Sequence, residues 1–276
     1  DICDSNLVDK IISQKPEVVV NFAAESHVDR SILDSNPFLK TNILGTYTLL
    51  ETVKKYRIGR FIQISTDEVY GSINEDSFRE MDLLNPSNLY SSSKAAADII
   101  ARSYYITYKM PILIIRSSNN FGPYQYPEKM VPLFITNLLE NKKIPLYGDG
   151  LNIRDWLYVL DNCEVVDLIL QKGKEGEIYN ISGGNEKTNL EIAQFILKEM
   201  GEHENHIEYV KDRLGHDRRY SLNCDKIKEE LGWKSKNNLE EMLRQTILWY
   251  KNNRWWWRKL KSREYLEYYK NQYLNR

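Results

Sequence analysis

Two short segments of the chain carry side chains that could perform acid–base chemistry. The first segment places the hydroxyl of Thr66 and the carboxyl groups of Asp67 and Glu68 directly after an apolar stretch, 61–64, that is typical of a strand. Removing water across two carbons requires a base for the C–H proton and an acid for the departing hydroxyl. Adjacent carboxyl groups in different environments can divide these roles. The alternative is a solvated acidic turn.

The second segment places the phenol of Tyr90 and the ammonium group of Lys94 four residues apart, on one face of a helix. Oxidation of an alcohol needs a base at the hydroxyl while hydride leaves the carbon. A free phenol has a pKa of about 10, and lowering it by about three units takes roughly 4 kcal/mol. Lys94 and an oxidised nicotinamide, both positive, would supply this stabilisation. The alternative is an exposed Tyr–Lys pair on an amphipathic helix. The spacing alone favours this alternative.

Composition limits the classes of partner. The chain of 276 residues is long enough for one large or two modest domains. Its 38 basic and 39 acidic residues nearly cancel, so charge gives no reason to expect nucleic acid or a membrane surface as a partner. Cys3, Cys163 and Cys224 are scattered, which indicates free thiols in a reducing compartment. No signal peptide or apolar run of about 20 residues is present.

The elements that must position these side chains follow from the hydrophobic pattern. Residues 17–24 are apolar and β-branched, as in a strand buried on both faces. A helix is predicted to begin at Asn36-Pro37, with apolar residues at helical spacing as far as Val53. A strand over 60–65, a helix over 87–108 and a strand over 112–115 follow. This alternation predicts an α/β fold with a doubly wound parallel sheet of the Rossmann type and right-handed crossovers.

A change of texture after Gly122 predicts a second, smaller α/β domain. Helices are predicted over 129–140, 159–171, 189–200, 224–231 and 239–252, and strands over 144–147 and 177–181. We therefore expect a domain of the dinucleotide-binding Rossmann type over 1–122 and a second domain mainly over 123–276, with segments near 155–182 returning to the first. The run Trp255-Trp256-Trp257 and the tyrosines from Tyr265 to Tyr273 are expected to pack on their own domain or on a partner subunit.

These residues lie within a larger set of motifs that resembles the nucleotide-sugar 4,6-dehydratases of the extended short-chain dehydrogenase superfamily. The paired Asp67-Glu68 is the specific feature, because related epimerases have small residues there. The motifs that carry the resemblance are Asp1-Ile2-Cys3-Asp4, Ala23-Ala24-Glu25-Ser26-His27-Val28-Asp29, Thr41-Asn42, Ser65-Thr66-Asp67-Glu68-Val69-Tyr70-Gly71, Tyr90-Ser91-Ser92-Ser93-Lys94, Arg116-Ser117-Ser118-Asn119-Asn120, Gly122-Pro123-Tyr124, Pro127-Glu128-Lys129, Arg154-Asp155-Trp156 and Gly215-His216-Asp217-Arg218-Arg219.

The resemblance implies a tightly bound NAD and a dTDP- or UDP-linked glucose as substrate. It implies that Tyr90, supported by Lys94, takes the proton of the C4 hydroxyl while Thr66 bonds the resulting carbonyl region. Glu68 would remove the C5 proton and Asp67 would protonate the departing C6 hydroxyl. The product would be a 4-keto-6-deoxy sugar nucleotide. The resemblance further implies a cytoplasmic homodimer that acts in deoxysugar synthesis.

The resemblance also assigns binding residues. For the cofactor these are Asp1, Ile2, Phe22, Ala23, Ala24, Glu25, Ser26, Thr41, Tyr90, Lys94 and Asn120. For the substrate they are Ser26, Thr66, Asn119, Lys129, Met130, Pro145, Leu146, Tyr147, Arg154, Asn189, Asp212, Arg213, Leu214, Gly215 and His216.

Some of these assignments have a physical basis and an ordinary alternative. The planar fork of Arg154 suits a diphosphate, and the Tyr147 ring could stack on a base. The alternatives are a structural pair between Arg154 and Asp155, a core aromatic at Tyr147 and a solvated charge at Lys129. His27 and His216 have no companions at ligand spacing, so no metal is expected.

The chain departs from the family pattern in two places. Leu214 stands where the family usually has proline, and the sequence contains no G-x-x-G-x-x-G turn. That turn lets a phosphate approach a helix N-terminus. Because Asp1 is not an initiator methionine, we expect the sequence to be a fragment whose glycine turn and first strands precede it. A non-catalytic nucleotide-sugar-binding protein is the alternative if the turn is truly absent.

Overall fold

The computed structural model describes residues 1–261 and 263–274. The chain divides into two compact units. Unit 1 comprises 1–119, 162–182 and 214–234, and unit 2 comprises 120–161, 183–213 and 235–276. Each unit is therefore assembled from segments that are distant in sequence. The return of 214–234 to unit 1 was not among the expectations from sequence.

Unit 1 is built on a parallel sheet of the order β1-β2-β3-β7. The strands are β1 (Val18–Asn21), β2 (Arg60–Thr66), β3 (Ile112–Ser117) and β7 (Ile178–Ile181). In register, Val19 lies opposite Phe61 and Ile62 opposite Leu113. Every residue of β3 is buried, as expected for a strand that is covered on both faces. The predicted α/β class with a parallel sheet is confirmed.

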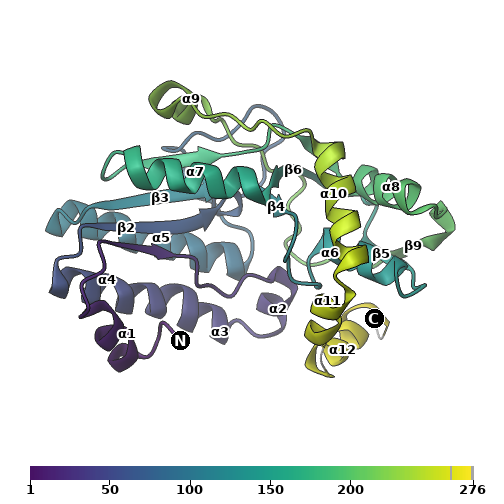
Figure 1. The fold of residues 1–276 in the computed structure, drawn as a ribbon, viewed down its shortest axis with the longest axis horizontal. Coiled ribbons are helices and arrows are strands. Elements are labelled where there is room, and N and C mark those ends of the chain that lie inside the picture. The colour runs from purple at the N-terminus through teal and green to yellow at the C-terminus, as the bar shows by residue number, and fades with distance from the viewer. Residues whose placement is uncertain (262, 275–276) are drawn as a thin grey trace. The chain divides into compact units, whose positions relative to one another are not determined.

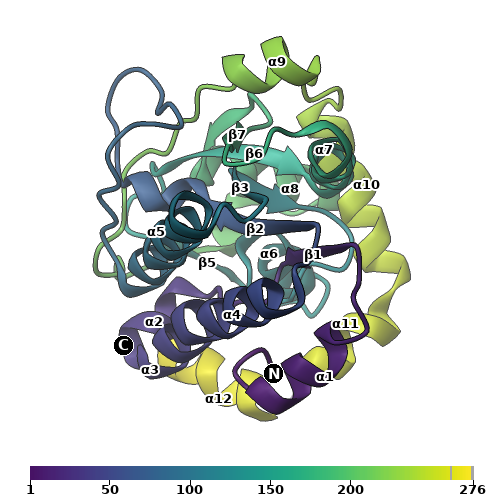
Figure 2. The ribbon, with the colours of Figure 1, turned by 90° about the vertical axis from the view of Figure 1, so that its left-hand side faces the viewer.

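Helices cover both faces of this sheet. Figures 1 and 2 show α4 (Thr46–Tyr56) and α5 (Leu89–Tyr108) on one face and α7 (Val159–Lys172) on the other. The core on the first side joins Leu50 and Val53 of α4 to Ala101 of α5 and Ile112 of β3. α1 (Ser5–Ile12) packs on α4, and α9 (Asp225–Leu231) packs on β7. The short helix α2 (Val28–Leu33) contacts α5.

The helix predicted to begin at Asn36-Pro37 forms as three consecutive pieces. These are α3 (Asn36–Phe38), the π-helical segment η1 (Leu39–Gly45) and α4. The N-cap is Ser35 rather than Asn36, and Pro37 lies within the first turn, where its missing N–H has no helical partner. Gly45 sits where η1 meets α4, and a Cβ there would lie 2.5 Å from the Ile2 side chain. The wider π turn brings the helix close to the chain start at this glycine.

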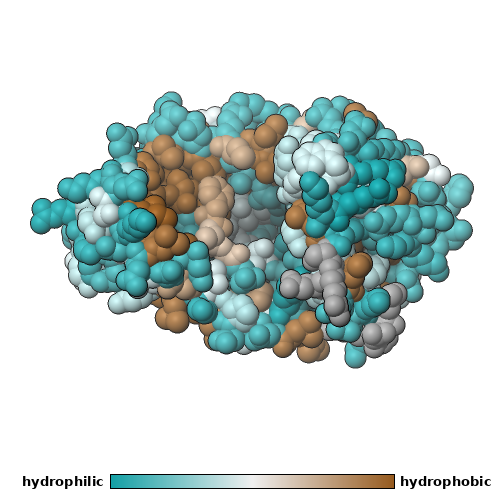
Figure 3. Space-filling view, turned by 60° about the horizontal axis from the view of Figure 1, so that its bottom comes forward, coloured by the Kyte–Doolittle hydropathy of each residue, from teal (hydrophilic) through white to brown (hydrophobic). Residues whose placement is uncertain are grey.

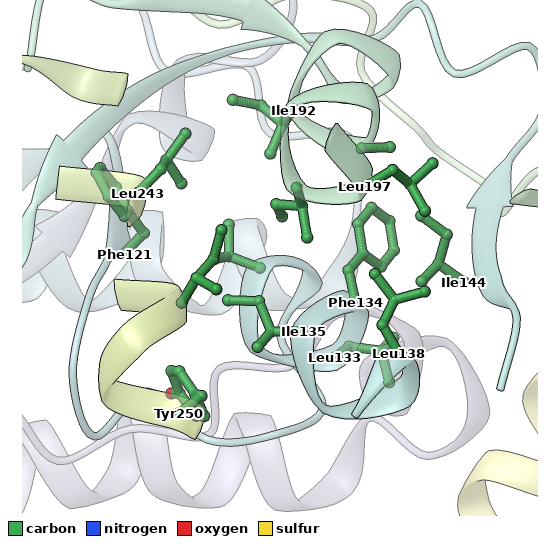
Figure 4. Packing of buried hydrophobic residues seen from close by; sticks show 14 of the residues in the cluster. Phe121, Leu133, Phe134, Ile135, Leu138, Ile144, Ile192, Leu197, Leu243 and Tyr250 are labelled. Carbon is green, nitrogen blue, oxygen red and sulfur yellow. The ribbon is translucent and has the colours of Figure 1, made fainter. Parts of the chain in front are cut away.

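Unit 2 surrounds a separate hydrophobic core (Figure 4). Two small sheets contribute to it: β4 (Asn119–Phe121), β6 (Ile153–Tyr158) and β8 (Glu186–Thr188) form one, and β5 (Ile144–Tyr147) pairs in parallel with β9 (Ile207–Val210). Three helices, α6 (Met130–Leu138), α8 (Asn189–Met200) and α10 (Leu239–Asn252), bring Phe134, Ile196 and Leu243 into this core. The short helix η3 (Glu204–His206) precedes β9.

The chain after α10 packs on unit 2, to which it belongs. It forms α11 (Arg254–Leu260), α12 (Arg263–Tyr269) and η4 (Lys270–Leu274). Trp257 is completely buried in the unit 2 core. The tail was expected to pack either on its own domain or on a partner subunit, and the structure shows it packed on its own domain.

The described residues contain no helix that is both long enough and apolar enough to cross a bilayer. Exposed apolar side chains nevertheless occur on the helices of unit 1, among them Leu44 of η1 and Ile99 of α5. Figure 3 brings the side of α1 and α4 forward and shows hydrophobic residues gathered over part of that surface.

Candidate active site

The carboxyl end of β2 presents the predicted acid–base residues. Thr66 is the last residue of β2 and caps the 3₁₀ turn η2 (Asp67–Tyr70), where its Oγ1 accepts a hydrogen bond from the Glu68 N–H at 3.3 Å. The same hydroxyl lies 3.1 Å from Asp67 Oδ1 and donates to it. Asp67 is 2% exposed, whereas Glu68 is only half-buried. The adjacent carboxyl groups thus lie in different environments, so the alternative of a solvated acidic turn is wrong.

Gly71 ends this turn in a conformation that only glycine adopts without strain. Its φ is +81°, and a Cβ would lie 2.3 Å from the backbone oxygen of Asn85. The Asn85 N–H donates to the Val69 carbonyl at 3.1 Å, which fastens the returning loop to the turn. The glycine therefore allows the loop over 72–88 to close against the acidic residues.

The first turns of α5 carry Tyr90 and Lys94. Asn88 and Ser91 form a capping box that fixes the helix start. Tyr90 is 9% exposed and meets the Phe38 ring edge-on at 6.4 Å between centroids. Lys94 is 5% exposed, and its Nζ donates to the Ile64 carbonyl of β2 at 2.6 Å. The pair is therefore buried against the sheet, and the alternative of an exposed Tyr–Lys face is wrong.

Tyr90 is electrostatically coupled to the residues at the end of β2. Burial and the negative charge of Glu68 raise the pKa of Tyr90, while its side-chain hydrogen bond with Thr66 acts in the opposite direction. The phenol and the acidic segment thus share one site. The direction of the pKa shift is opposite to what alcohol oxidation needs, so the protein groups alone do not activate this phenol.

A buried ionic network lies behind Lys94. Asp98, one helical turn further along α5, accepts hydrogen bonds from Arg116 Nε and from Ser65 Oγ, each at 2.9 Å. Arg116 in turn donates to the Tyr70 hydroxyl at 2.8 Å. Burial lowers the pKa of Lys94 to about 8, and the Asp98 carboxylate opposes that shift. Asp98 therefore favours the charged form of Lys94, against the effect of burial.

Glu68 has a neighbour that the sequence reading did not assign. The Tyr220 hydroxyl lies 3.4 Å from Glu68 Oε2 and 2.7 Å from Asp217 Oδ2. Asp217 also accepts a hydrogen bond from Ser87. Asp217 belongs to a motif that supported the family resemblance, but nothing in the local pattern indicated that it and Tyr220 lie beside η2. The contact depends on the return of 214–234 to unit 1.

The predicted cofactor segment after β1 is held by a buried amide. Asn42 Oδ1 accepts from the Glu25 N–H at 2.9 Å, and its Nδ2 donates to the Glu25 carbonyl and to Ser93 Oγ at 3.0 and 2.8 Å. Asn42 therefore joins this segment to α5, next to Tyr90 and Lys94. Phe22 is 60% exposed beyond the end of β1. Thr41 precedes this amide on η1, and Ile2 packs against unit 1.

Unit 2 carries most residues assigned to the nucleotide diphosphate. Tyr147 ends β5, Asp212 follows the parallel strand β9, and the Gly148 N–H donates to the Val210 carbonyl at 3.0 Å. At Gly148, where φ is +56°, a Cβ would lie 3.0 Å from Asp212 Oδ2. The structure therefore brings Tyr147 and Asp212 together.

A second pair lies on the other sheet of unit 2. The pair is Arg154 and Asn189. Arg154 on β6 is 4% exposed and lies opposite Lys187 of β8, and Asn189 follows Lys187 by two positions. Asn189 is buried, and its Oδ1 has no hydrogen-bond partner among the described residues. Asp155 accepts hydrogen bonds from the Gly183, Gly184 and Asn185 N–H groups at 3.0–3.3 Å. Asp155 thus ties β6 to a loop and is not the partner that the alternative reading of Arg154 required.

The remaining assigned residues divide between the units. Lys129 caps α6 and Met130 begins it, while Pro145 and Leu146 are buried in β5. Asn120 lies in unit 2 and Asn119 ends the first segment of unit 1. The loop over 212–216 is shared, with Asp212 and Arg213 in unit 2 and Leu214, Gly215 and His216 in unit 1. Asp1, Ala23, Ala24 and Ser26 lie in unit 1.

Known proteins resemble this chain over most of its length. The model of the family described as GDP-mannose 4,6 dehydratase matches residues 1–246. The chain belongs to this family. Among its curated members, dTDP-glucose 4,6-dehydratase of Streptomyces antibioticus is 48% identical over 95% of this chain and 78% of that protein. The enzyme of the same name from Haemophilus influenzae is 48% identical over 91% of this chain and 81% of that protein.

Solved structures of the family share this fold. DesIV, a dTDP-glucose 4,6-dehydratase from Streptomyces venezuelae solved with NAD and TYD (dTDP) bound, has a TM-score of 0.93 and 46% identity. The match covers 95% of this chain and 81% of that chain. The Bacillus anthracis dTDP-glucose 4,6-dehydratase in complex with NAD has a TM-score of 0.88 and 50% identity over the same shares.

No group of three or more His, Cys, Asp or Glu side chains within 1–261 and 263–274 is arranged to hold a metal ion.

Proposed function

We propose that this protein converts dTDP-glucose to dTDP-4-keto-6-deoxyglucose with tightly bound NAD. The observation that carries the proposal is that Tyr90 and the acidic segment share one site. There the charge of Glu68 raises the pKa of the Tyr90 phenol, and Thr66 forms a side-chain hydrogen bond with it. A phenol, a hydroxyl and adjacent carboxyl groups are the parts that alcohol oxidation and dehydration require. The curated relatives with this name support the choice of reaction.

In the first half of the reaction Tyr90 takes the proton from the sugar C4 hydroxyl. Thr66, which caps η2 and hydrogen-bonds with Tyr90, donates to the oxygen that becomes the C4 carbonyl. Lys94 and an oxidised nicotinamide would together supply positive charge near the phenol, and the Asp98 carboxylate favours the charged form of Lys94. Positive charge favours the phenolate form that accepts the proton.

In the second half the carboxyl groups divide the dehydration. Glu68, half-buried and next to Tyr220, removes the C5 proton, which the C4 carbonyl has made acidic. Asp67, almost fully buried and bonded to Thr66, gives a proton to the C6 hydroxyl as it leaves as water. Glu68 returns its proton to C5 at the end. Protons and oxygen balance, because Glu68 is restored when it protonates C5, the proton gained by Tyr90 and the proton lost by Asp67 are exchanged through solvent, and one water leaves.

The residues of unit 1 fit a nicotinamide cofactor. The buried Lys94 ammonium makes one hydrogen bond, to Ile64, among the described residues, so two of its donors remain for ribose hydroxyls. Phe22 and the segment held by Asn42 border the end of β1, where parallel α/β sheets bind ligands. When bound, NAD would accept the hydride of C4 and return it at C6. DesIV and the Bacillus anthracis enzyme were solved with NAD.

For the nucleotide we propose contacts from unit 2. Arg154 would bind the diphosphate through its planar fork. The unpartnered Oδ1 of Asn189 would accept a hydrogen bond from a hydroxyl or N–H group of the nucleotide. Tyr147 would stack on the base, with Asp212 and Arg213 beside it. The same catalytic residues would serve UDP-glucose, so the base preference depends on unit 2.

The test is to incubate the purified full-length protein and NAD with dTDP-glucose, UDP-glucose and GDP-mannose in parallel. The 4-keto product is followed by its absorbance in alkali. We expect the highest kcat/KM for dTDP-glucose. Faster turnover of another sugar nucleotide would reassign the substrate, and binding without any product would favour a non-catalytic nucleotide-sugar-binding protein.

We further propose a cytoplasmic homodimer. The outer sides of α4 and α5 carry exposed apolar residues, including Tyr47, Ile99 and Ile106, which are 48%, 60% and 54% exposed. Burying such a surface against a second copy is favourable. The free thiols of Cys3, Cys163 and Cys224 suit a reducing compartment. Light scattering of the wild type and of Ile99→Asp would test the dimer, which the substitution is expected to dissociate.

A further inference from the structure

The chain beyond residue 246 lies outside the part matched by the family model, yet it is firmly attached to unit 2. Trp257 of α11 is completely buried, and its Nε1 donates to the Tyr250 carbonyl at 2.9 Å. Lys261 pairs with Glu140 at 3.0 Å, and the Lys261 side chain is only 7% exposed. The segment that follows therefore starts from a fixed point.

From this point α12 and η4 continue across α6. The Tyr269 hydroxyl accepts a hydrogen bond from Nδ2 of Asn137, a buried residue of α6, at 2.8 Å. Tyr269 also contacts the Tyr273 ring at 5.0 Å between centroids. The contacts thus lead from the buried tryptophan to the end of the chain.

The end of this segment lies on Tyr147. Gln272 is 2% exposed, and its Nε2 donates to the Tyr147 hydroxyl at 2.6 Å. The Tyr273 ring lies 5.9 Å from the Tyr147 ring between centroids, at an interplanar angle of 40°. Tyr147 is therefore held at its hydroxyl and beside its ring by residues that follow each other in η4.

Burial of the Gln272 side-chain amide lowers the stability of the fold more than a purely structural role would explain. Its Oε1 is buried and has no hydrogen-bond partner among the described residues. A buried acceptor without a partner lowers stability, and such a group calls for an explanation beyond packing. Among the described residues, the hydrogen bond to Tyr147 is the one hydrogen bond of this side chain.

We propose that η4 forms part of the base-binding site of the nucleotide sugar and that Gln272 is the positioning residue that fixes the Tyr147 ring for a pyrimidine base. The inference rests on the proposed function, because it takes Tyr147 as a contact of the nucleotide. A stacking ring that is fixed before the ligand arrives loses less entropy on binding. Removing the bond to Gln272 therefore weakens nucleotide binding and leaves the acid–base residues of unit 1 unaltered.

The experiment measures dTDP binding by calorimetry and dTDP-glucose turnover for Gln272→Met, Tyr147→Phe and the double variant in the full-length holoenzyme. Gln272→Met retains size but lacks the donor. We expect a three- to tenfold increase in the Kd for dTDP and in KM, with kcat within about twofold, as for loss of one hydrogen bond. The double variant is expected to bind no more weakly than Tyr147→Phe, because both changes remove the same bond.

The matched control is Gln245→Met, since Gln245 is an exposed glutamine of α10 whose hydrogen bond to Glu241 is local. Its Kd is expected to equal that of the wild type. Unchanged dTDP affinity in Gln272→Met, with or without a lower Tm, would overturn the inference and leave η4 as a structural cap. Additive losses in the double variant would overturn it as well.

Gln272→Glu is a second variant in case the methionine variant fails to fold. At this buried place the carboxyl group would be protonated, and its O–H can donate to the Tyr147 hydroxyl as the amide does, so binding near the wild-type level is expected. The binding assay does not require turnover. A wild type that binds dTDP but yields no keto sugar would refute the proposed reaction, while the comparison of Kd values would still decide the role of Gln272.

Discussion

The residues proposed for catalysis in unit 1 and those proposed for nucleotide binding in unit 2 are positioned in different ways. In unit 1, Lys94 rests on a buried network of charges in which Asp98 binds Arg116 and Ser65. In unit 2, Tyr147 and Asp212 are placed by strand pairing and a glycine turn, and Asp155 binds backbone N–H groups. Under the proposed function, chemistry on the hexose would depend on buried charges, whereas recognition of the nucleotide would depend on where short strands end.

This difference predicts different consequences for substitution. Changes in unit 1 should alter single steps of the reaction or the charge states behind them. Changes in unit 2 should alter affinity and leave turnover intact. Substitutions of single residues in each unit test this separation.

Tyr90→Phe is expected to lower the rate of C4 oxidation by about 10³- to 10⁴-fold, because the general base is removed. The change is measured as the single-turnover absorbance of reduced cofactor. Tyr108→Phe, on the exposed side of the same helix, is the control and should behave as wild type. Cofactor reduction at the normal rate in Tyr90→Phe would remove Tyr90 from its role.

Glu68→Gln is expected to permit C4 oxidation but to slow elimination by about 10²- to 10³-fold, because an amide cannot take the C5 proton. The measurement is exchange of the C5 hydrogen with deuterated solvent, together with the yield of keto product. The exposed Glu75→Gln serves as control in the same loop region. Product formation at the wild-type rate would contradict the role of Glu68.

Arg154→Ala is expected to raise KM for the nucleotide sugar by about 10- to 100-fold with kcat little changed, the effect of losing charge-assisted hydrogen bonds. Steady-state kinetics and dTDP calorimetry measure it. Arg244→Ala removes an arginine that is 44% exposed on α10 and should change neither constant. A loss confined to kcat would break the separation between the units.

Asp98→Asn tests the charge network and its pH dependence. Leaving Arg116 without its buried partner should lower the free energy of unfolding by about 3–5 kcal/mol. Burial already lowers the pKa of Lys94 to about 8, and Asp98 opposes this. Without Asp98 that pKa falls further, so Lys94 loses its charge at lower pH.

The alkaline limb of the kcat/KM profile of Asp98→Asn should therefore move to lower pH. Asp225→Asn, which alters an exposed carboxylate at the start of α9, should leave the profile unchanged. An unshifted profile in a folded Asp98→Asn protein would mean that Asp98 acts only on stability.

Tyr220→Phe is expected to have the smallest effect, a two- to fivefold loss in the elimination step. The contact of Tyr220 with Glu68 is long, at 3.4 Å, and its shorter bond is to Asp217. Solvent exchange at C5 measures the step, and Tyr209→Phe, 58% exposed on β9, is the control. A larger effect on C4 oxidation than on elimination would contradict the role of Tyr220 beside Glu68.

The sequence predicted the parts of unit 1 that depend on local pattern. The bounds of α5 and β2 differ from the prediction by one or two residues, because an apolar strand and a capped amphipathic helix are encoded by neighbours in the chain. The sequence also predicted β5 and α8 with their observed bounds. The residues of the acidic segment and of the Tyr–Lys pair were recognised by type and spacing.

Features that depend on distant segments could not be predicted in this way. The sequence reading missed β6, β8 and β9, which have only three to six residues and owe their form to pairing partners. The contact of Tyr220 with Glu68 joins residues separated by 152 positions. The direction of the Tyr90 pKa shift was also missed, because burial was not visible in the helical spacing.

The most direct test uses dTDP-glucose that carries deuterium at C4. The position of this deuterium is followed through the reaction of the wild-type enzyme. If Tyr90, Glu68 and Asp67 act on one hexose in one site, the deuterium should appear in the C6 methyl group of the product, and the C5 hydrogen should come from solvent. Loss of the deuterium to water, or a product that retains it at any other carbon, would contradict the account.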